Sequence, residues 1–462
     1  MGIAASLFYS TSDTENCLDW RVRPSDEQYD AQKERWNDLA DHLRDDLAQR
    51  SDCSIASWLQ GSYKFGTQVR PAGPEEEFDI DLGVYFQWSG EPDDGKHGPV
   101  DLKTFVQDSL SEYVANDDND AASVGEPRGA KCSRAHFEDG FHIDVPAYHL
   151  DGERDARALA TEENEWEDSD PKAIYAWWKQ TTGDTDRPRC RRLVRYLKMW
   201  AALRFEGKSR PSSITLTVLV GEAFQELDRD DYSGDDEFLR AITSELVARL
   251  RNSYAVTNPA NRNEDLSRLS DEDKSSLLTK LEDLLSIADR ALAARTKTAS
   301  AEIWSEAFDH FFPVPEDDDQ EEAVLKIAES RALATLKFNP VVSVQARTGS
   351  RVFHGTDRIG PIPKGCDITF SLANYHALPA GAVVSWMVRN SGKEAEDKND
   401  LGHRVGEGFS VARDSAYRGD HHMDVAIKLN GLLIGSKRIP VIITGLGMPR
   451  RNPPRPAYTE LR

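Results

Sequence analysis

The feature that most constrains the fold is a ten-residue stretch, residues 77–86, with the sequence EFDIDLGVYF. Large apolar side chains occupy alternate positions in it, and Asp79 and Asp81 lie between them. This period of two is typical of a β-strand with one buried face, and it directs both carboxylates to the opposite face. A second run, FHIDVPAYHL at 141–150, predicts another strand. Its Asp144 is expected to complete a cluster of three carboxylates.

Around these strands the sequence predicts a mixture of helices and sheet. Ser25 and Gln28 form a capping-box pattern before a long amphipathic helix. Another helix is expected at 102–114, followed by a polar loop before the second strand. From Pro171, a residue suited to the first turn of a helix, helical periodicity continues to about residue 315. The predicted fold class for this part is α+β.

The C-terminal part has a different character. The tract PVPEDDDQEE at 313–322 has the proline and charge content of a solvated linker. Short β-type runs follow, and Asn430-Gly431 between two of them is a strong hairpin signal. A β-sandwich is therefore expected. The expected domains are residues 1–165, a core with the N-terminal helix; 166–315, a helical lobe; 316–337, an acidic linker with a short helix; and 338–462, the sandwich.

Composition excludes several classes of protein. The 462 residues carry a net charge of −23, which argues against a general nucleic-acid or anionic-membrane binder. The five cysteines are odd in number and never spaced C-x-x-C, so neither a disulfide framework nor a cysteine zinc site is indicated. No apolar run reaches the roughly 20 residues of a membrane-spanning helix. A cytoplasmic protein without membrane insertion is expected.

The three carboxylates indicate metal-dependent chemistry. Asp79 and Asp81, two residues apart on a strand, point the same way and can share one or two divalent cations. Two Mg²⁺ ions about 3.5–4 Å apart, with Mn²⁺ as an alternative, would activate an attacking hydroxyl and stabilise a leaving pyrophosphate. Upstream, Gly61 and Ser62 offer amide N–H groups and a hydroxyl to a phosphate tail. This combination predicts nucleotidyl transfer.

A D-x-D pattern alone is more often a solvated loop or strand edge than a metal site. Here the two carboxylates interrupt an otherwise apolar strand, and this context favours a functional role for them. His142, two residues before Asp144, is interpreted as a packed structural histidine rather than a neighbour of the metals.

The segment 187–210 is the second unusual feature, with nine basic side chains against one acidic residue. Arg191, Arg195 and Lys198 share one helical face and are candidates to meet triphosphates or a longer polyanion. The alternative is that these cations neutralise acidic neighbours within the fold.

Two serines follow the basic segment. Ser212 and Ser213, after a proline, can bind a phosphate or a base edge, and a simple helix N-cap is an equally good interpretation.

Taken together, the motifs resemble the signature of the CD-NTases, the cGAS/DncV-like nucleotidyltransferases of bacterial anti-phage (CBASS) signalling. They are QGSYKFGT at 60–67, DID at 79–81, HIDVP at 142–146, RLVRYLKMW at 192–200 and RPSSI at 210–214. The C-terminal runs VVSWMVRNSG and AYRGDHHMDV are similar to the AGS-C sensor domain that is fused to such enzymes. The first resemblance extends over roughly residues 20–315.

The resemblance implies a DNA polymerase β-like nucleotidyltransferase core joined to a helical lobe, with two Mg²⁺ ions and nucleoside triphosphate substrates. It assigns metal binding and catalysis to Asp79, Asp81 and Asp144. It assigns nucleotide binding to Gln60, Gly61 and Ser62 of the triphosphate-binding turn, and to Lys198, Ser212 and Ser213 of the helical lobe.

The leading hypothesis is an enzyme that makes a cyclic or linear oligonucleotide second messenger, which a separate effector protein reads. A second hypothesis is nucleotide transfer to RNA, a protein or a small molecule. A third is a catalytically silent nucleic-acid sensor, which is disfavoured because a silent domain has no reason to keep three clustered like charges. The basic balance of residues 403–462, with 10 Lys and Arg against 5 Asp and Glu, suits regulation by a nucleotide or nucleic acid.

Overall fold

The structure, a computed structural model, describes residues 2–12, 14, 16–73, 76–116, 119–125, 132–138, 140–315, 338–429 and 432–445. The chain divides into two compact units. The first comprises Met1–Phe308 and Phe312–Pro315, and the second comprises Asp309–Phe311 and Glu316–Arg462. No helix within these described ranges has the length and apolar character needed to cross a membrane. The acidic linker expected at 316–337 lies outside the described residues.

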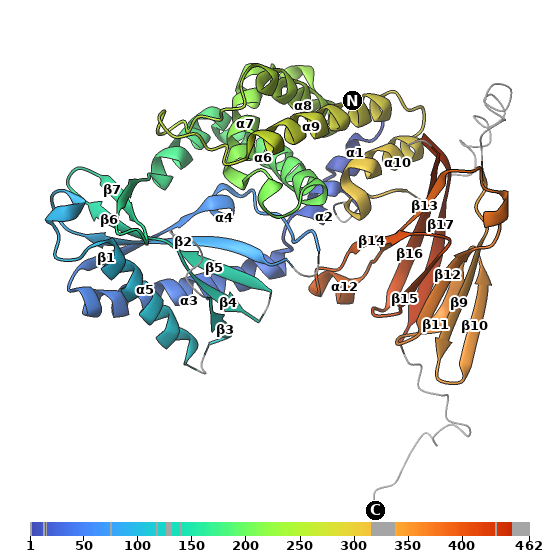
Figure 1. Ribbon diagram of the computed structural model, residues 1–462, viewed down its shortest axis with the longest axis horizontal. Coiled ribbons are helices and arrows are strands. Elements are labelled where there is room, and N and C mark those ends of the chain that lie inside the picture. Colours follow the sequence, from blue (N-terminus) through green and yellow to red (C-terminus); the bar gives the residue numbers. More distant parts are fainter. Residues whose placement is uncertain are drawn as a thin grey trace, which may run out of the picture. The chain divides into compact units, whose positions relative to one another are not determined.

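The described part of the first unit contains an eight-stranded mixed sheet (Figure 1). Its strands are β1 (Ser54–Gln60), β2 (Phe78–Gln87), β3 (Ala121–Val124), β4 (Ser133–Phe137), β5 (Phe141–Val145), β6 (Ala147–Asp151), β7 (Ala156–Ala160) and β8 (Trp166–Asp168). Their order is β3-β4-β5-β2-β6-β7-β8, and β1 pairs antiparallel with β2. Both β5 and β6 run parallel to β2 in one register, which joins Asp81 to Asp144 and Val84 to Ala147. The strand predicted at 141–150 is therefore two successive strands divided at Pro146.

Two helices cover the apolar face of this sheet: α3 (Asp26–Ser51) and α5 (Pro99–Val114). The predicted capping box begins α3, since the Ser25 side chain accepts from the Gln28 amide and the Gln28 side chain accepts from the Ser25 amide. Leucines on the inner sides of both helices pack with the apolar side chains of the strands into one core. The alternate side chains of β2, including the two aspartates, are left on the opposite face.

One expectation about this region is wrong. The stretch between α5 and β5, expected to be a polar loop, contains β3 and β4. In β4, Ala135 and Phe137 are buried in the core, and Arg134 and His136 alternate with them. A five-residue strand with only one large apolar side chain on its inward face gives a weak periodic signal, and pairing with β5 supplies the stability that the local sequence lacks.

The remaining helices of the first unit are α1 (Ala5–Phe8), α2 (Leu18–Val22), α4 (Gly61–Phe65), α6 (Pro171–Arg204), α7 (Ser213–Glu226), α8 (Asp235–Asn252), α9 (Asp271–Leu292) and α10 (Lys297–Phe308). Helix α6 unites two predicted helical segments, with non-helical backbone at Gly183 between them. Pro171 occupies its first turn as expected, and Asp170 caps it by accepting from two backbone amides.

The second unit is a two-sheet β-sandwich, as predicted. One sheet has the order β10-β9-β12-β15 and the other β11-β17-β16-β13-β14, and their facing apolar side chains form a single core. The elements are β9 (Val342–Thr348), β10 (Arg351–Thr356), β11 (Ile359–Pro363), β12 (Asp367–Leu372), β13 (Ala382–Arg389), α12 (Lys393–Asp397), β14 (Gly402–Glu407), β15 (Ser410–Asp414), β16 (Gly419–Leu429) and β17 (Leu432–Thr444). The predicted hairpin turn, Asn430-Gly431, lies outside the described residues, but β16 and β17 on either side of it pair antiparallel.

Candidate active site

The three predicted carboxylates meet on the polar face of the sheet. The parallel register of β2 and β5 places Asp79 opposite His142 and Asp81 opposite Asp144. Ligand atoms of Asp79, His142 and Asp144 all lie within 4.8 Å of one another. The sheet therefore brings together, from two strands more than sixty positions apart in sequence, the cluster that the alternating pattern predicted.

Electrostatic crowding in this cluster is strongest at Asp81. Burial raises the pKa of the Asp81 carboxyl well above its usual range, and the negative charges of Asp79 and Asp144 add to this effect. At Asp79, burial also raises the pKa, but a hydrogen bond with His142 and the positive charges nearby outweigh it, so its net shift is downward. Carboxylates held this close, one of them in an unfavourable charged state, are suited to binding cations.

Arg134 of β4 is a member of the site that the sequence interpretation missed. Its Nε and one Nη donate to the two oxygens of Asp144 at 2.5 and 2.7 Å. A carboxylate has about four lone-pair sites, so this fork leaves Asp144 able to accept another partner. The signal that could have revealed Arg134 was the alternation of Ser133, Ala135 and Phe137 on the core side of β4.

His142 also differs from its predicted role as a structural histidine. It is buried, as expected, yet its Nε2 lies 3.2 Å from Asp79 Oδ1 and its Nδ1 lies 2.9 Å from Glu77 Oε2. Burial lowers the pKa of the imidazole, but hydrogen bonds and charge from Asp79 and Glu77 outweigh this, and the net shift is upward. The ring therefore connects the carboxylate cluster to Glu77.

The turn that precedes β2 fits tightly against the cluster. Gly61 begins α4 with a φ of 57°, and a Cβ atom at this position would fall 1.8 Å from Asp81 Oδ2. Only a residue without a side chain allows the turn to approach the carboxylate so closely. Gln60 is placed differently, because its amide bonds with the hydroxyls of Tyr85 and Tyr148, at 2.9 and 3.2 Å.

Lys198 reaches the same region from α6. Its Nζ donates to the Thr67 carbonyl at 2.9 Å. Burial lowers the pKa of this lysine to about 8, although the charges of Asp79 and Asp81 partly oppose the shift. A lysine held this way retains a positive charge at neutral pH, yet this charge is poorly solvated and therefore favours an anionic ligand.

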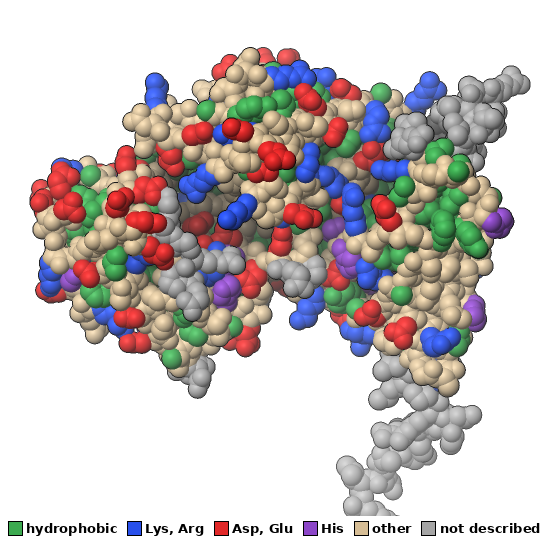
Figure 2. Space-filling view, in the orientation of Figure 1, with side chains coloured by type: hydrophobic (Ala, Val, Ile, Leu, Met, Phe, Trp, Pro, Cys, Tyr) green, Lys and Arg blue, Asp and Glu red, His purple; other side chains and the backbone are tan. Residues whose placement is uncertain are grey.

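A cavity of about 130 Å³ adjoins these groups. It is lined by Ser62, Gln68, Glu76, Glu77, Asp79, Lys198, Arg210 and Ser213, among other residues. Figure 2 shows a hollow in the surface between the sheet and the helical lobe, with acidic and basic side chains around it. Both parts of the first unit thus contribute to the lining, with Asp79 coming from the sheet and Lys198 from helix α6.

Of the two serines, only Ser213 lines the cavity. The Ser212 hydroxyl instead caps α7 by accepting from the Thr215 amide, which matches the N-cap interpretation.

Most of the basic segment is engaged in internal contacts, in agreement with the alternative interpretation. Arg189 and Arg192 both pair with Asp235, and Arg195 pairs with Asp19. Arg191 donates to the Phe65 carbonyl. The concentration of positive charge in the sequence therefore arises largely because the helices of this unit are joined by ion pairs.

Family models match three regions of the chain. Residues 56–148 match the model described as "Cyclic GMP-AMP synthase DncV-like, nucleotidyltransferase domain", and residues 188–316 match "Cyclic GMP-AMP synthase, C-terminal domain". Residues 329–444 match the "Adenylyl/Guanylyl and SMODS C-terminal sensor domain". The first two matches contain the carboxylates and Lys198, and the third contains the sandwich.

Comparison with whole proteins gives the same relationship. The chain is 31% identical over 449 residues to a cyclic GMP-AMP synthase of Escherichia albertii, and the aligned region covers 95% of this chain and 96% of that protein. Identity is 24% over 297 residues to a cyclic GMP-AMP synthase of Vibrio cholerae, covering 54% of this chain and 66% of that protein.

Solved structures resemble the fold. A Vibrio cholerae di-nucleotide cyclase (DncV) in complex with ATP, GTP and 5MTHFGLU2 superposes with a TM-score of 0.58 at 20% identity, over 67% of this chain and 97% of that one. Escherichia coli DncV bound to 3'-deoxy GTP gives a TM-score of 0.56 at 21% identity, over 65% and 95%. The chain is thus a nucleotidyltransferase that belongs to the DncV-like cyclic GMP-AMP synthase family, with an AGS-C sensor domain at its C-terminal end.

Proposed function

We propose that this protein joins nucleoside triphosphates into a cyclic dinucleotide of the cyclic GMP-AMP kind, a second messenger read by a separate anti-phage effector. The observation that carries the proposal is the clustering of Asp79, Asp81 and Asp144 on two neighbouring strands, next to a cavity that Asp79 and Lys198 line. The full-length relative from Escherichia albertii is named for this activity. The reaction would be attack of a ribose hydroxyl on an α-phosphorus, with loss of pyrophosphate, carried out twice to close the ring.

The residues present fit two Mg²⁺ ions, with Mn²⁺ as an alternative. Asp79, Asp81 and Asp144 supply only oxygen donors, which suit hard cations. The raised pKa of Asp81 supports this assignment, because its cause is burial with like charges and a cation would remove that cost. The ions, when bound, would supply activation of the attacking hydroxyl and stabilisation of the leaving pyrophosphate.

The other residues would bind and orient the triphosphate. We assign to Lys198 a contact with phosphate oxygens, since its charge is poorly solvated in the protein alone. Ser62 and Ser213 both line the cavity and would donate from their hydroxyls. Gly61 would act through the backbone, by allowing the turn to lie against Asp81. Gln60 and Ser212 would support the site indirectly, because each bonds within the fold.

The proposed division of labour follows the predicted domains. Residues 1–165 would hold the metals, 166–315 would close the nucleotide cavity, and 338–462 would regulate the enzyme. The sensor-domain match and the basic balance of residues 403–462 support the regulatory role. A protein truncated before residue 338 should differ from the full chain in its basal rate or in its rate with an added nucleotide or nucleic acid. Equal rates of the two proteins, both with and without this addition, would contradict regulation.

The activity test is incubation of the purified protein with all NTPs and dNTPs and Mg²⁺, without another acceptor, followed by mass spectrometry. We expect a cyclic dinucleotide containing adenine and guanine, and none from a variant with Asp79→Asn and Asp81→Asn. Product formation only when RNA, a protein or a small-molecule acceptor is added would instead support transfer to that acceptor. Equal product from the double variant would contradict the assigned site.

A further inference from the structure

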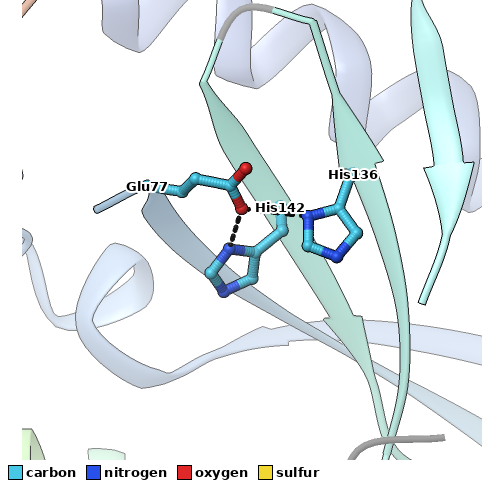
Figure 3. A group of neighbouring side chains, drawn as sticks. All are labelled: Glu77, His136 and His142. Carbon is cyan, nitrogen blue, oxygen red and sulfur yellow. Dashed lines mark hydrogen bonds and ion pairs between the residues drawn. The ribbon is translucent and has the colours of Figure 1, made fainter. Parts of the chain in front are cut away.

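A second cluster of metal-binding side chains lies beside the carboxylates on the same face of the sheet. Figure 3 shows Glu77, His136 and His142 pointing toward one another from three neighbouring segments. Nδ1 of His136 lies 3.0 Å from Glu77 Oε2, and Nδ1 of His142 lies 2.9 Å from the same oxygen. The ligand atoms of the three residues all lie within 4.8 Å of one another.

The register of the sheet is responsible for this arrangement. Antiparallel pairing of β4 with β5 sets His136 opposite His142. Glu77 directly precedes β2, whose Phe78 pairs with Phe141, so Glu77 continues the row of polar side chains that includes Asp79. The two histidines therefore lie on paired strands and Glu77 lies directly before a third strand, and strand positions hold ligands with little freedom.

The donor set differs in kind from the carboxylate site. Two imidazole nitrogens and one carboxylate oxygen are typical ligands of zinc and similar divalent transition metals, and three protein ligands leave a coordination position open. In a tetrahedral zinc site, with bonds of about 2.0–2.1 Å, the ligand atoms lie about 3.3 Å apart. The two contacts of Glu77, at 2.9 and 3.0 Å, are close to that spacing, and the ligand atoms of the two histidines lie within 4.8 Å of each other, so an ion could replace the hydrogen bonds after shifts of the side chains.

Solvent reaches the cluster from one side. The side chains of Glu77 and His136 are 35% and 30% exposed, and that of His142 is 10% exposed. The open side gives an ion an entry path, and the buried histidine faces the catalytic carboxylates. We propose that Glu77, His136 and His142 form a binding site for a zinc-like divalent transition metal, distinct from the magnesium site, and that occupancy of this site inhibits the enzyme through His142.

The coupling follows from the two nitrogens of His142. A metal on Nδ1 would fix the proton on Nε2, which lies 3.2 Å from Asp79 Oδ1. Metal-bound histidines commonly donate this second N–H to a carboxylate. The donation would hold Asp79 toward His142 and compete with its binding of Mg²⁺. This last step rests on the proposed role of Asp79 in the function above, whereas the metal site itself does not.

Binding is tested first, without activity. Full-length, metal-free protein is titrated with Co²⁺, monitored by visible absorption, and with Zn²⁺ by calorimetry. We expect one site of this kind. His136→Ala and Glu77→Gln should each weaken it by more than about 100-fold, because even outer-shell partners of metal ligands are worth 10–100-fold.

Matched controls locate the site. His97→Ala removes another partly buried histidine of the same unit, which contacts the Ser51 carbonyl, and should leave binding unchanged. Asp81→Asn alters the carboxylate cluster without touching the three ligands, and should also retain binding. Thermal unfolding is measured for each variant. If His136→Ala does not fold, the metal binding of Glu77→Gln decides the test.

The inhibition is tested on the active enzyme, with rates measured over a range of Mg²⁺ with and without Zn²⁺. Zinc should raise the Mg²⁺ concentration needed for half-maximal rate in the wild type and have a much smaller effect on His136→Ala. Wild-type protein that binds neither Co²⁺ nor Zn²⁺, or variants that bind as tightly as the wild type, would overturn the proposed site. Inhibition that is equal in wild type and His136→Ala would overturn the coupling. A protein that binds zinc as expected but makes no nucleotide product would contradict the proposed function alone.

Discussion

Replacing Lys198 by methionine should make the protein more stable and less active. The pKa of Lys198 falls from 10.5 to about 8 in the folded protein, mainly because burial disfavours its charge. A difference of about 2.5 pKa units, at about 1.4 kcal/mol for each unit, means that the charged lysine costs about 3 kcal/mol at neutral pH. Loss of its hydrogen bond to the Thr67 carbonyl costs about 1 kcal/mol. The net gain in the free energy of unfolding is therefore about 2 kcal/mol.

The assay is thermal unfolding of the two proteins at several pH values. At neutral pH the gain corresponds to a rise in Tm of about 3 °C for a unit of this size, using about 2.1 cal/mol/K of unfolding entropy per residue. The unfolded chain takes up the Lys198 proton below about pH 10.5 and the folded chain only below about pH 8. The stability of the wild type therefore rises with pH through this window, and the advantage of the variant should shrink there.

Activity should change in the opposite direction. Without the positive charge, we expect a raised KM for nucleoside triphosphates if the contact is equally strong in the ground and transition states. Lys208→Met is the matched control, since this lysine belongs to the same basic segment but is exposed. A Lys198→Met protein with unchanged KM and no gain in Tm would refute both the burial argument and the assignment to the substrate site.

Three further outcomes are expected. The variant with Asp79→Asn and Asp81→Asn should lose product formation yet remain folded, because the change removes metal-binding charge at nearly constant volume; near wild-type turnover would place the active site elsewhere. Gly61→Ala should lower the rate by about 100-fold and the free energy of unfolding by about 1–2 kcal/mol, since the added Cβ meets Asp81 and the φ of Gly61 is positive. The control is Gly152→Ala, because no atom lies within 4 Å of a Cβ at that position. Equal effects of the two substitutions would contradict the close approach of Gly61 to Asp81. In the sandwich, Asp424→Asn should cost about 3 kcal/mol, as it deprives the buried Arg389 and the partly buried Arg438 of their shared carboxylate. Burial raises the pKa of Asp424, but the two arginines outweigh it and lower the pKa overall. The contribution of Asp424 to the free energy of unfolding should therefore be present at neutral pH and lost in acid. A wild-type free energy of unfolding that does not fall as the pH is lowered would contradict this.

The features that the sequence alone predicted correctly are local or strongly periodic. The alternation in residues 77–86 predicted β2 and the shared face of Asp79 and Asp81, because side-chain direction along a strand depends only on position. The start of α3 followed from Ser25 and Gln28, which satisfy each other's backbone amides within one turn. The α+β class and the C-terminal sandwich followed in the same way, from changes in period along the chain.

Only the tertiary structure decided how distant segments meet. The sequence marked Arg189, Arg192 and Arg195 as an unusual concentration of charge, but their acidic partners come from other helices, so no local pattern distinguishes an internal ion pair from a ligand site. Arg134 and His136 were missed because the alternation in the five-residue β4 is a weak signal, and the strand depends on its pairing with β3 and β5.

The arrangement of the site depends on the same long-range contacts. The sequence indicated that Gly61 and Lys198 matter, yet their places beside Asp81 and near Asp79 come from the packing of α4 and α6 against the sheet. The sequence by itself therefore identified the carboxylates, the glycine and the lysine of the site, whereas Arg134 and the contacts of His142 became visible only in the fold. The fold determined their distances and pKa values, because both depend on burial and on charges contributed by residues far away in the chain.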